Sequence, residues 1–321
     1  MYYPYFRGRQ AELLALKDLA SSGLLSCNII PIIEPVKVSS AIRRTIETFT
    51  YRQKKIAVIL NPEKGISSKK NSNVVWCDTL QLEGKANVVP AFLLRENAES
   101  IVRNYIQKSS CMNKSTLGFA TRRSFDFFKS TKGVHLLSSL KPTVFAYPDE
   151  GEFIRETGRI LNNANCSAKT ILFRDAFHKR RVNADYAEEP DEHFSSDHLE
   201  YVDNGYSGFG DYSIVGDAYE EAGFAPRAVA IHIVYFDDNN ELRIHHFVSD
   251  SNADFRNVAK KFGEAGDKLE KWCSQKPGLR HTKGLDALLE YSHNKAFPGL
   301  PTIKKLSIMH HLELIGQFLD K

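Results

Sequence analysis

The chain has few cysteines and no long apolar segment, and each shortage excludes a class of protein. Its five cysteines are widely separated, and none forms a Cys-x-x-Cys pair. An odd number of scattered thiols argues against a disulfide framework and against a cysteine zinc site. No run of about 18 uncharged apolar residues is present, so no membrane span is expected. Residues 1–7 lack the features of a signal peptide, and the chain is therefore expected to be cytoplasmic with reduced thiols.

Common phosphate-binding and catalytic motifs are absent as well. The sequence has no Gly-x-x-x-x-Gly-Lys-Ser/Thr phosphate loop and no Gly-x-Ser-x-Gly nucleophile elbow. The glycine-rich residues 205–211 (GYSGFGD) do not open a helix after a strand, as a dinucleotide fingerprint would. We predict a turn-rich loop or lid here, formed by Gly208, Gly210 and Asp211, whose aromatic neighbours could stack on a base.

Charge is distributed unevenly along the chain. The formal net charge is +4, but residues 182–226 contain twelve acidic side chains and no lysine or arginine. The remaining residues therefore carry 43 basic against 27 acidic side chains. A basic body of this kind favours anionic partners through its summed field.

Short apolar runs recur along the chain and are separated by amphipathic, helix-like stretches. Continuous runs rich in Val, Ile, Phe and Leu are typical of strands buried on both faces. The runs cover residues 2–7, 28–34, 56–61, 87–94, 116–122, 142–147, 169–175 and 228–236. Their alternation with helices predicts an α/β fold with parallel pairing. Eight runs favour a (βα)8 TIM-barrel-like sheet, and an open doubly wound sheet is the alternative.

The alternation breaks in the last third of the chain. Residues 176–227 are too long for a simple connection, so we predict an acidic insertion or long loop before the last strand. It would lie within a single barrel-like domain that spans residues 1–321.

Beyond the insertion, residues 228–236 and 242–248 flank an Asp-Asp-Asn-Asn turn signal and predict a β-hairpin. In the final helical stretch, apolar residues at helical spacing predict a C-terminal helix that docks on the barrel wall. These residues are Ile308, Leu312, Ile315 and Leu319.

The carboxyl ends of the predicted strands carry the candidate binding residues, because sites in parallel α/β folds form at those ends. The candidates are Arg7, Lys37, Asn61, Arg95, Arg122, Tyr147 and Arg174. Guanidinium groups match phosphate and carboxylate oxygens, so several at one mouth would form an anion site. The alternative is a structural ring in which the arginines pair with Glu34, Asp149 and Asp175.

Glu34 and Asp175 are the candidate catalytic residues. Glu34 follows an apolar strand, so it is expected to be partly buried and could act as a general base or hold a divalent metal. A salt bridge to Arg7 is the alternative. Asp175 could orient Arg174 or act as a second carboxylate, which also leaves glycoside hydrolysis open.

The histidines give weaker signals. His193 and His198 lie among acids but fit no standard metal-ligand spacing, so a solvated acidic loop is predicted. His245 and His246 are expected on opposite faces of a strand. One histidine of the 310–311 pair is expected to be a hydrogen-bonded packing residue.

Several segments resemble the beta protein family, which is named for a T-even phage protein and has bacterial members. The opening YYPYFRGRQAELLAL is followed by IIPIIEPVK, IAVILNP and VVPAFLL. The resemblance continues through GFGDYSIVG, AVAIHIVYF and IMHHLELIGQFL, and so covers most of the chain. It implies a barrel-like cytoplasmic protein from a mobile or phage-defence context, often encoded beside a partner gene. It implies no reaction and no catalytic residues.

Two functions follow as hypotheses. In the first, the protein binds a nucleotide or nucleic acid at the barrel mouth and hydrolyses it, as a phosphodiesterase or nuclease-like enzyme that could use a divalent metal. In the second, it is a non-catalytic partner or regulator of a neighbouring-gene product, which it recognises through its acidic insertion.

Overall fold

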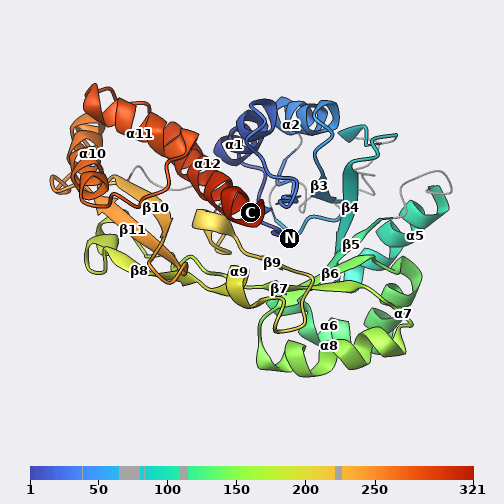
Figure 1. Ribbon diagram of the computed structural model, residues 1–321. Coiled ribbons are helices and arrows are strands. Elements are labelled where there is room, and N and C mark those ends of the chain that lie inside the picture. The colour runs from blue at the N-terminus through green and yellow to red at the C-terminus, as the bar shows by residue number, and fades with distance from the viewer. Residues whose placement is uncertain (38, 65–79, 83, 109–114, 221–225) are drawn as a thin grey trace. The chain divides into compact units, whose positions relative to one another are not determined.

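The computed structural model describes residues 1–321 except 38, 65–79, 83, 109–114 and 221–225 (Figure 1). The chain divides into two compact units, and the single barrel-like domain over residues 1–321 stays a prediction. The first unit contains residues 1–9, 29–174 and 200–211. The second contains residues 10–28, 175–199 and 212–321.

The first unit is built on a parallel sheet of eight strands whose spatial order follows the chain. The strands are β1 (Tyr5–Phe6), β2 (Ile32–Ile33), β3 (Ile56–Ile59), β4 (Val88–Leu93), β5 (Leu117–Phe119), β6 (Val144–Pro148), β7 (Lys169–Phe173) and β9 (Gly208–Gly210). All neighbouring pairs are parallel, as the near-continuous apolar runs predicted.

Hydrogen bonds between the first and last strands give the sheet its barrel-like closure. Tyr2 bridges Phe209 in parallel, and the amides of Tyr3 and Tyr5 donate to the carbonyls of Phe209 and Asp211, both at 2.8 Å. The α/β class and the barrel-like sheet are therefore confirmed. An open doubly wound sheet, the alternative, would leave its last strand unpaired with the first, whereas here β9 is hydrogen-bonded to the residues that lead into β1.

Aromatic rings fill the interior of this sheet. Tyr5 on β1 contacts Phe119 on β5 at 5.2 Å between ring centroids, and Phe119 contacts Phe173 on β7 at 4.8 Å. These strands are not neighbours, so their side chains can meet only across the inside of the barrel. The interior is a packed core, and polar chemistry is restricted to its ends.

Helices cover the outside of strands β3 to β7. They are α2 (Ser40–Tyr51), α5 (Glu99–Lys108), α6 (Phe125–Lys129), α7 (Thr131–Leu140) and α8 (Gly151–Asn163). Helix α2 shows why they form: Ser39 caps its amino end, and Ile42, Ile46 and Phe49 make one buried stripe. Phe128 of α6 stacks on Phe145 of β6, which fixes this helix to the outer face of the sheet (Figure 1).

The eighth barrel strand is a correction to the sequence analysis. It was predicted at residues 228–236, but the structure uses Gly208–Gly210, which had been interpreted as a lid or loop with Asp211. Glycine's low strand propensity concealed the strand. Its neighbours explain the glycines: a Cβ at Gly210 would lie 2.5 Å from the Tyr3 carbonyl oxygen, and one at Gly208 would lie 2.7 Å from that of Met1. Only glycine lets the backbone approach this closely.

Gly210→Ala is therefore expected to destabilise the first unit by about 1–3 kcal/mol, because backbone must shift to admit the methyl group. Gly158→Ala in α8 is the matched control, since a Cβ there meets nothing within 4 Å. It should be neutral or stabilising by roughly 0.5–1 kcal/mol. Urea unfolding followed by circular dichroism measures both, and equal stability of the two variants would refute the packing argument.

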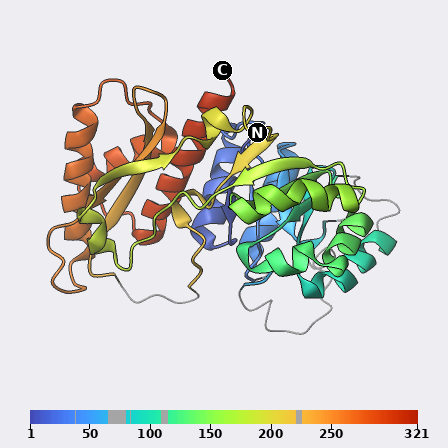
Figure 2. The same cartoon turned by 90° about the horizontal axis from the view of Figure 1, so that it is seen from below.

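The second unit contains a three-stranded antiparallel sheet in the order β10-β11-β8. The strands are β8 (Asp191–Ser195), β10 (Ala230–Phe236) and β11 (Leu242–Val248). The helices are α1 (Gln10–Ser21), α9 (Asp197–Glu200), α10 (Val258–Ser274), α11 (Lys283–His293) and α12 (Leu300–Leu319). Figure 2 shows the strands with α12 beside them. The hairpin prediction is confirmed, because β10 and β11 pair from Ala230↔Val248 to Phe236↔Leu242.

The C-terminal helix buries most of its predicted apolar stripe. Ile308, Leu312 and Ile315 are fully buried, as their spacing predicted. Within the second unit, α12 packs on β10, α11 and α1, and its docking on the barrel wall stays a prediction. Periodicity identifies a buried face but does not say which surface covers it.

No helix in the described part of the chain is long and apolar enough to cross a membrane. The cysteines that the structure describes, Cys27, Cys166 and Cys273, form no disulfide, and Cys77 and Cys111 lie outside the described residues.

Candidate functional site

Glu34 lies at the carboxyl end of β2 with none of its surface exposed. Its Oε2 accepts from the Tyr5 hydroxyl at 3.0 Å and from the Arg7 guanidinium. Its Oε1 accepts from the backbone amides of Glu63 and Lys64 at 2.6 and 3.0 Å. Four donors thus occupy both oxygens, which suits an anchor for the β1, β2 and β3 ends better than a general base.

Arg7 is held as firmly as its partner. Only 8% of its side chain is exposed, and its guanidinium lies 4.9 Å from the Tyr5 ring centroid while pairing with Glu34. Glu34 therefore forms the salt bridge to Arg7 that was the alternative to a general base or metal ligand. A buried pair of this kind is expensive to break, so Arg7 is not a ready ligand for an external anion.

Asn61 and Arg95 join β3 to β4. The Asn61 amide donates to the Leu93 carbonyl and accepts from the Leu93 amide, both at 2.8 Å, so it continues the sheet ladder. Arg95 donates to the carbonyls of Asn61 and Pro62 at 3.0 and 2.9 Å. Both side chains stabilise the mouth, and the Asn61 amide is bound to the backbone of Leu93 through both its nitrogen and its oxygen.

The exposed side of the mouth has a different character. Arg122 pairs with Glu150, and the two side chains are 69% and 39% exposed. Arg174 pairs with Asp149 at 2.5 Å, with 40% and 18% exposed. Arg123, which the predicted site had omitted, reaches Glu63 at 3.4 Å and is 75% exposed. These carboxylates partly form the structural ring that was the alternative to an anion site.

The other predicted residues lie as follows. Lys37 is exposed after β2. Tyr147 is buried beside Tyr206, and burial, followed by the hydrogen bond to Tyr206, raises its pKa well above the usual value. Asp211 accepts from the Tyr2 hydroxyl at 2.6 Å. Asp175 begins the second unit, where its carboxylate accepts from the Asp217 amide at 3.0 Å.

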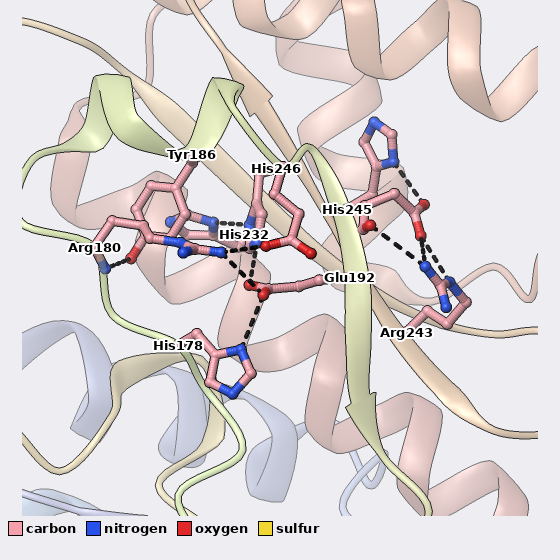
Figure 3. Close-up of polar contacts among 10 residues, drawn as sticks. His178, Arg180, Tyr186, Glu192, His232, Arg243, His245 and His246 are labelled. Atoms are coloured by element: carbon pink, nitrogen blue, oxygen red, sulfur yellow. Dashed lines mark hydrogen bonds and ion pairs between the residues drawn. The ribbon is translucent and has the colours of Figure 1, made fainter.

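A second polar assembly, which the sequence analysis did not predict, lies on the three-stranded sheet (Figure 3). Its centre is the pair Asp191 and Glu192 at the start of β8. Adjacent residues of a strand face opposite sides, so each carboxylate collects its own partners. His245 and His246 of β11 divide in the same way: His245 bonds to Asp191 and His246 to Glu192. Their predicted opposite orientation is confirmed.

Glu192 holds a chain of histidines on one face. Its Oε2 is 2.9 Å from Nδ1 of His178 and 3.1 Å from Arg180, and its Oε1 is 3.0 Å from Nε2 of His246. Nδ1 of His246 is 2.8 Å from Nδ1 of His232. The carboxylate can only accept, so a neutral His246 donates from Nε2, and His232 carries its own proton on Nδ1. Burial lowers the pKa of both histidines, so this arrangement is the one present at neutral pH.

Asp191 organises the other face. It accepts from Arg243 and Tyr235 at 2.7 Å and from Nδ1 of His245 at 2.8 Å. Burial by itself would raise the pKa of Asp191, but hydrogen bonds from His245, Tyr235 and Arg243 lower it to about 2. Asp191 is therefore a fixed anion that orients these three side chains.

The rest of the predicted acidic loop is also ordered by internal contacts. Glu189 pairs with Arg180 at 2.7 Å, and Asp185 accepts from the Val182 amide.

The two histidines of this stretch are also bonded. His193 lies on β8 and bonds to Ser196, and the buried His198 bonds to the Asn240 carbonyl at 2.7 Å. The prediction of a solvated loop is wrong here, because the alternation of buried Glu192 and Phe194 in β8 was masked by the acids around it.

The described residues contain no group of three or more His, Cys, Asp or Glu side chains arranged to hold a metal ion. Comparison of the chain with protein-family models, with curated proteins and with solved structures gives no match, so the functional argument depends on the residues of the two assemblies described above.

Proposed function

We propose that the protein binds a phosphate-bearing ligand, a nucleotide or the end of a nucleic acid, at the carboxyl end of its barrel-like sheet. The single observation that supports this is the set of exposed guanidinium groups after β5 and β7, on Arg122, Arg123 and Arg174. By analogy, barrel enzymes place their sites at this end of the sheet.

The carboxylates beside these arginines do not exclude a ligand. An exposed ion pair is worth only about 0–1 kcal/mol, so a doubly charged phosphate can replace Glu150 or Glu63 as the partner. The buried Arg7–Glu34 pair is different, because breaking it leaves an uncompensated charge. In this proposal Arg122, Arg123 and Arg174 bind the phosphate, while Arg7, Glu34, Asn61 and Arg95 hold the strand ends in place.

Hydrolysis is not included in the proposal. Glu34 was the intended general base, yet its oxygens are occupied by four donors. Because the Glu34 carboxylate is occupied in this way, it also does not support glycosidase chemistry in which Glu34 and Asp175 would act as a pair. The proposal is therefore a binding function, together with the beta protein membership and the conflict-associated context that the resemblance implies.

The double variant Arg122→Ala/Arg123→Ala tests the proposal. We expect it to weaken binding of ATP or a 5′-phosphorylated oligonucleotide by about 10–100-fold, since each charge-assisted hydrogen bond contributes roughly 1.5–3 kcal/mol. Calorimetric titration at low and at moderate salt measures this, and binding should weaken as salt rises. Arg159→Ala in α8 is the control, because Arg159 is 65% exposed and paired with Glu156. If neither probe binds, or if the control loses as much affinity, the proposal is wrong.

Recognition of a partner through residues 176–227 is the alternative, and β8 changes how it must be tested. Deleting residues 185–203 would remove a strand of the second unit, so lost association would report unfolding. Charge reversal at the exposed Glu188 and Asp203 tests the same idea with the sheet intact.

A further inference from the structure

A cavity lies beside β11 and α10 in the second unit, on the Asp191 face of the three-stranded sheet. Its volume is about 290 Å³. That is near the lower end of the roughly 300–1,000 Å³ typical of small-molecule sites, so it suits one ring system rather than a polymer. Among the residues that the structure describes, no aspartate or glutamate lines it.

Aromatic rings form one wall of the cavity. Trp272 of α10 lies 5.1 Å from His245 and 5.5 Å from Phe247, measured between ring centroids. All three residues line the cavity, so a flat ring would find stacking and edge contacts there.

A positive charge lies at the same cavity. Lys268 is committed, since it donates to the Val248 carbonyl at 2.7 Å and pairs with Asp250 at 2.6 Å. Lys271, one turn further along α10, is exposed, and within the described part of the chain its ammonium group makes no ion pair or hydrogen bond. It is available to an anionic group on a ligand.

His245 adds directionality. The anionic Asp191 accepts a hydrogen bond from Nδ1–H of His245, so in the neutral ring Nε2 is an acceptor. Among the described residues no donor reaches this Nε2. A carboxylate-oriented imidazole at a cavity wall presents a fixed acceptor to a ligand's N–H or O–H group.

We propose that this cavity is a binding site for a small aromatic anion: one planar ring system with a hydrogen-bond donor, carrying a single carboxylate or phosphate group. The ring packs on Trp272 and Phe247, its donor bonds Nε2 of His245, and its anionic group pairs with Lys271. The site is separate from the proposed phosphate site of the first unit, and its test uses a local reporter for that reason.

The test follows Trp272 fluorescence in the full chain carrying Trp76→Phe, which leaves Trp272 as the only tryptophan. The probes are 4-hydroxyphenylacetate, its neutral amide, and adenosine monophosphate. We expect a saturable change with at least one anionic probe and binding about tenfold weaker with the amide, a loss of about 1.4 kcal/mol. Response to the carboxylate alone identifies an aromatic acid as the ligand class, and response to the monophosphate alone identifies a nucleotide.

Three variants separate the site from general effects. Lys271→Ala and His245→Asn should each weaken binding about tenfold; asparagine retains a donor for Asp191 but lacks Nε2. Lys260→Ala, another exposed lysine of α10, should bind as the parent does. Absence of a saturable response to every probe overturns the proposal, as does unchanged affinity in Lys271→Ala. A response that survives Lys271→Ala and disappears in Arg122→Ala/Arg123→Ala would instead assign the ligand to the first unit.

Discussion

Glu34→Ala is expected to destabilise the first unit by about 3–5 kcal/mol, because it leaves the guanidinium of Arg7 buried without its counter-charge. The substitution also removes the acceptor for the Tyr5 hydroxyl and for the amides of Glu63 and Lys64. Urea unfolding monitored by circular dichroism would show the loss as a lower transition midpoint. An effect this large would assign Glu34 to the architecture of the mouth.

Two companion variants make this result interpretable. Glu156→Ala breaks the exposed pair with Arg159 on α8 and should cost less than about 1 kcal/mol. Arg7→Met/Glu34→Leu removes both charges and should recover much of the loss, since apolar replacements of buried pairs are often neutral. If Glu34→Ala were no more harmful than Glu156→Ala, the anchoring role would be contradicted.

The second large effect is expected at mildly acidic pH, where the second unit should lose stability. His310 and His311 of α12 are fully buried; His310 donates to the Val234 carbonyl at 2.6 Å and lies 2.8 Å from the Thr282 hydroxyl. Burial lowers the pKa of His310 to about 4 and that of His311 to about 3. The sequence analysis expected one packing histidine here, and the structure has two.

The sign follows from the direction of these shifts. Above about pH 6.5 both histidines are neutral in the folded and unfolded states, and the stability is fully present. As the pH falls below 6.5, these histidines bind protons in the unfolded chain but stay neutral in the folded chain. The free energy of unfolding therefore decreases. Between pH 7 and pH 5 the two histidines should together lower the free energy of unfolding by about 4 kcal/mol. The lowered pKa values of His232 and His246 act in the same direction.

Urea unfolding at pH 7, 6 and 5, followed by Trp272 fluorescence in the Trp76→Phe background, measures this loss. His310→Gln should reduce the pH dependence by about one proton. His293→Gln, at an exposed position of α11, should leave it unchanged. If His310→Gln does not fold, the slope of the parent protein still tests the prediction, since a flat stability between pH 7 and pH 5 would disprove it.

The candidate site was predictable in part. Strand ends can be located from apolar runs, so Arg7, Glu34, Asn61 and Arg95 were placed at the mouth from the sequence. Their roles were not predictable, because a charge at a strand end serves a ligand or a neighbour depending on which donors surround it. The four donors to Glu34 come from residues near positions 5, 7, 63 and 64, and only folding brings them together.

In the histidine–carboxylate assembly, the orientation of the side chains was predictable but their partners were not. His245 and His246 could be assigned to opposite faces because a strand has a period of two residues. Their partners, Asp191 and Glu192, lie more than 50 residues earlier in a stretch whose many acids suggested a solvated loop. These carboxylates gain their partners because β8 pairs with a strand far away in the sequence, and no local pattern identifies such residues.

The sequence by itself determined the α/β class, the parallel pairing of the first seven strands and the β10–β11 hairpin. These features depend on hydrophobic periodicity, which is local. Tertiary structure decided that Gly208–Gly210 completes the barrel, that α12 covers β10, and which charges neutralise each other. Those outcomes depend on close backbone approach and on contacts between residues far apart in the chain, where the free energy of a group is set by its surroundings rather than by its neighbours in sequence.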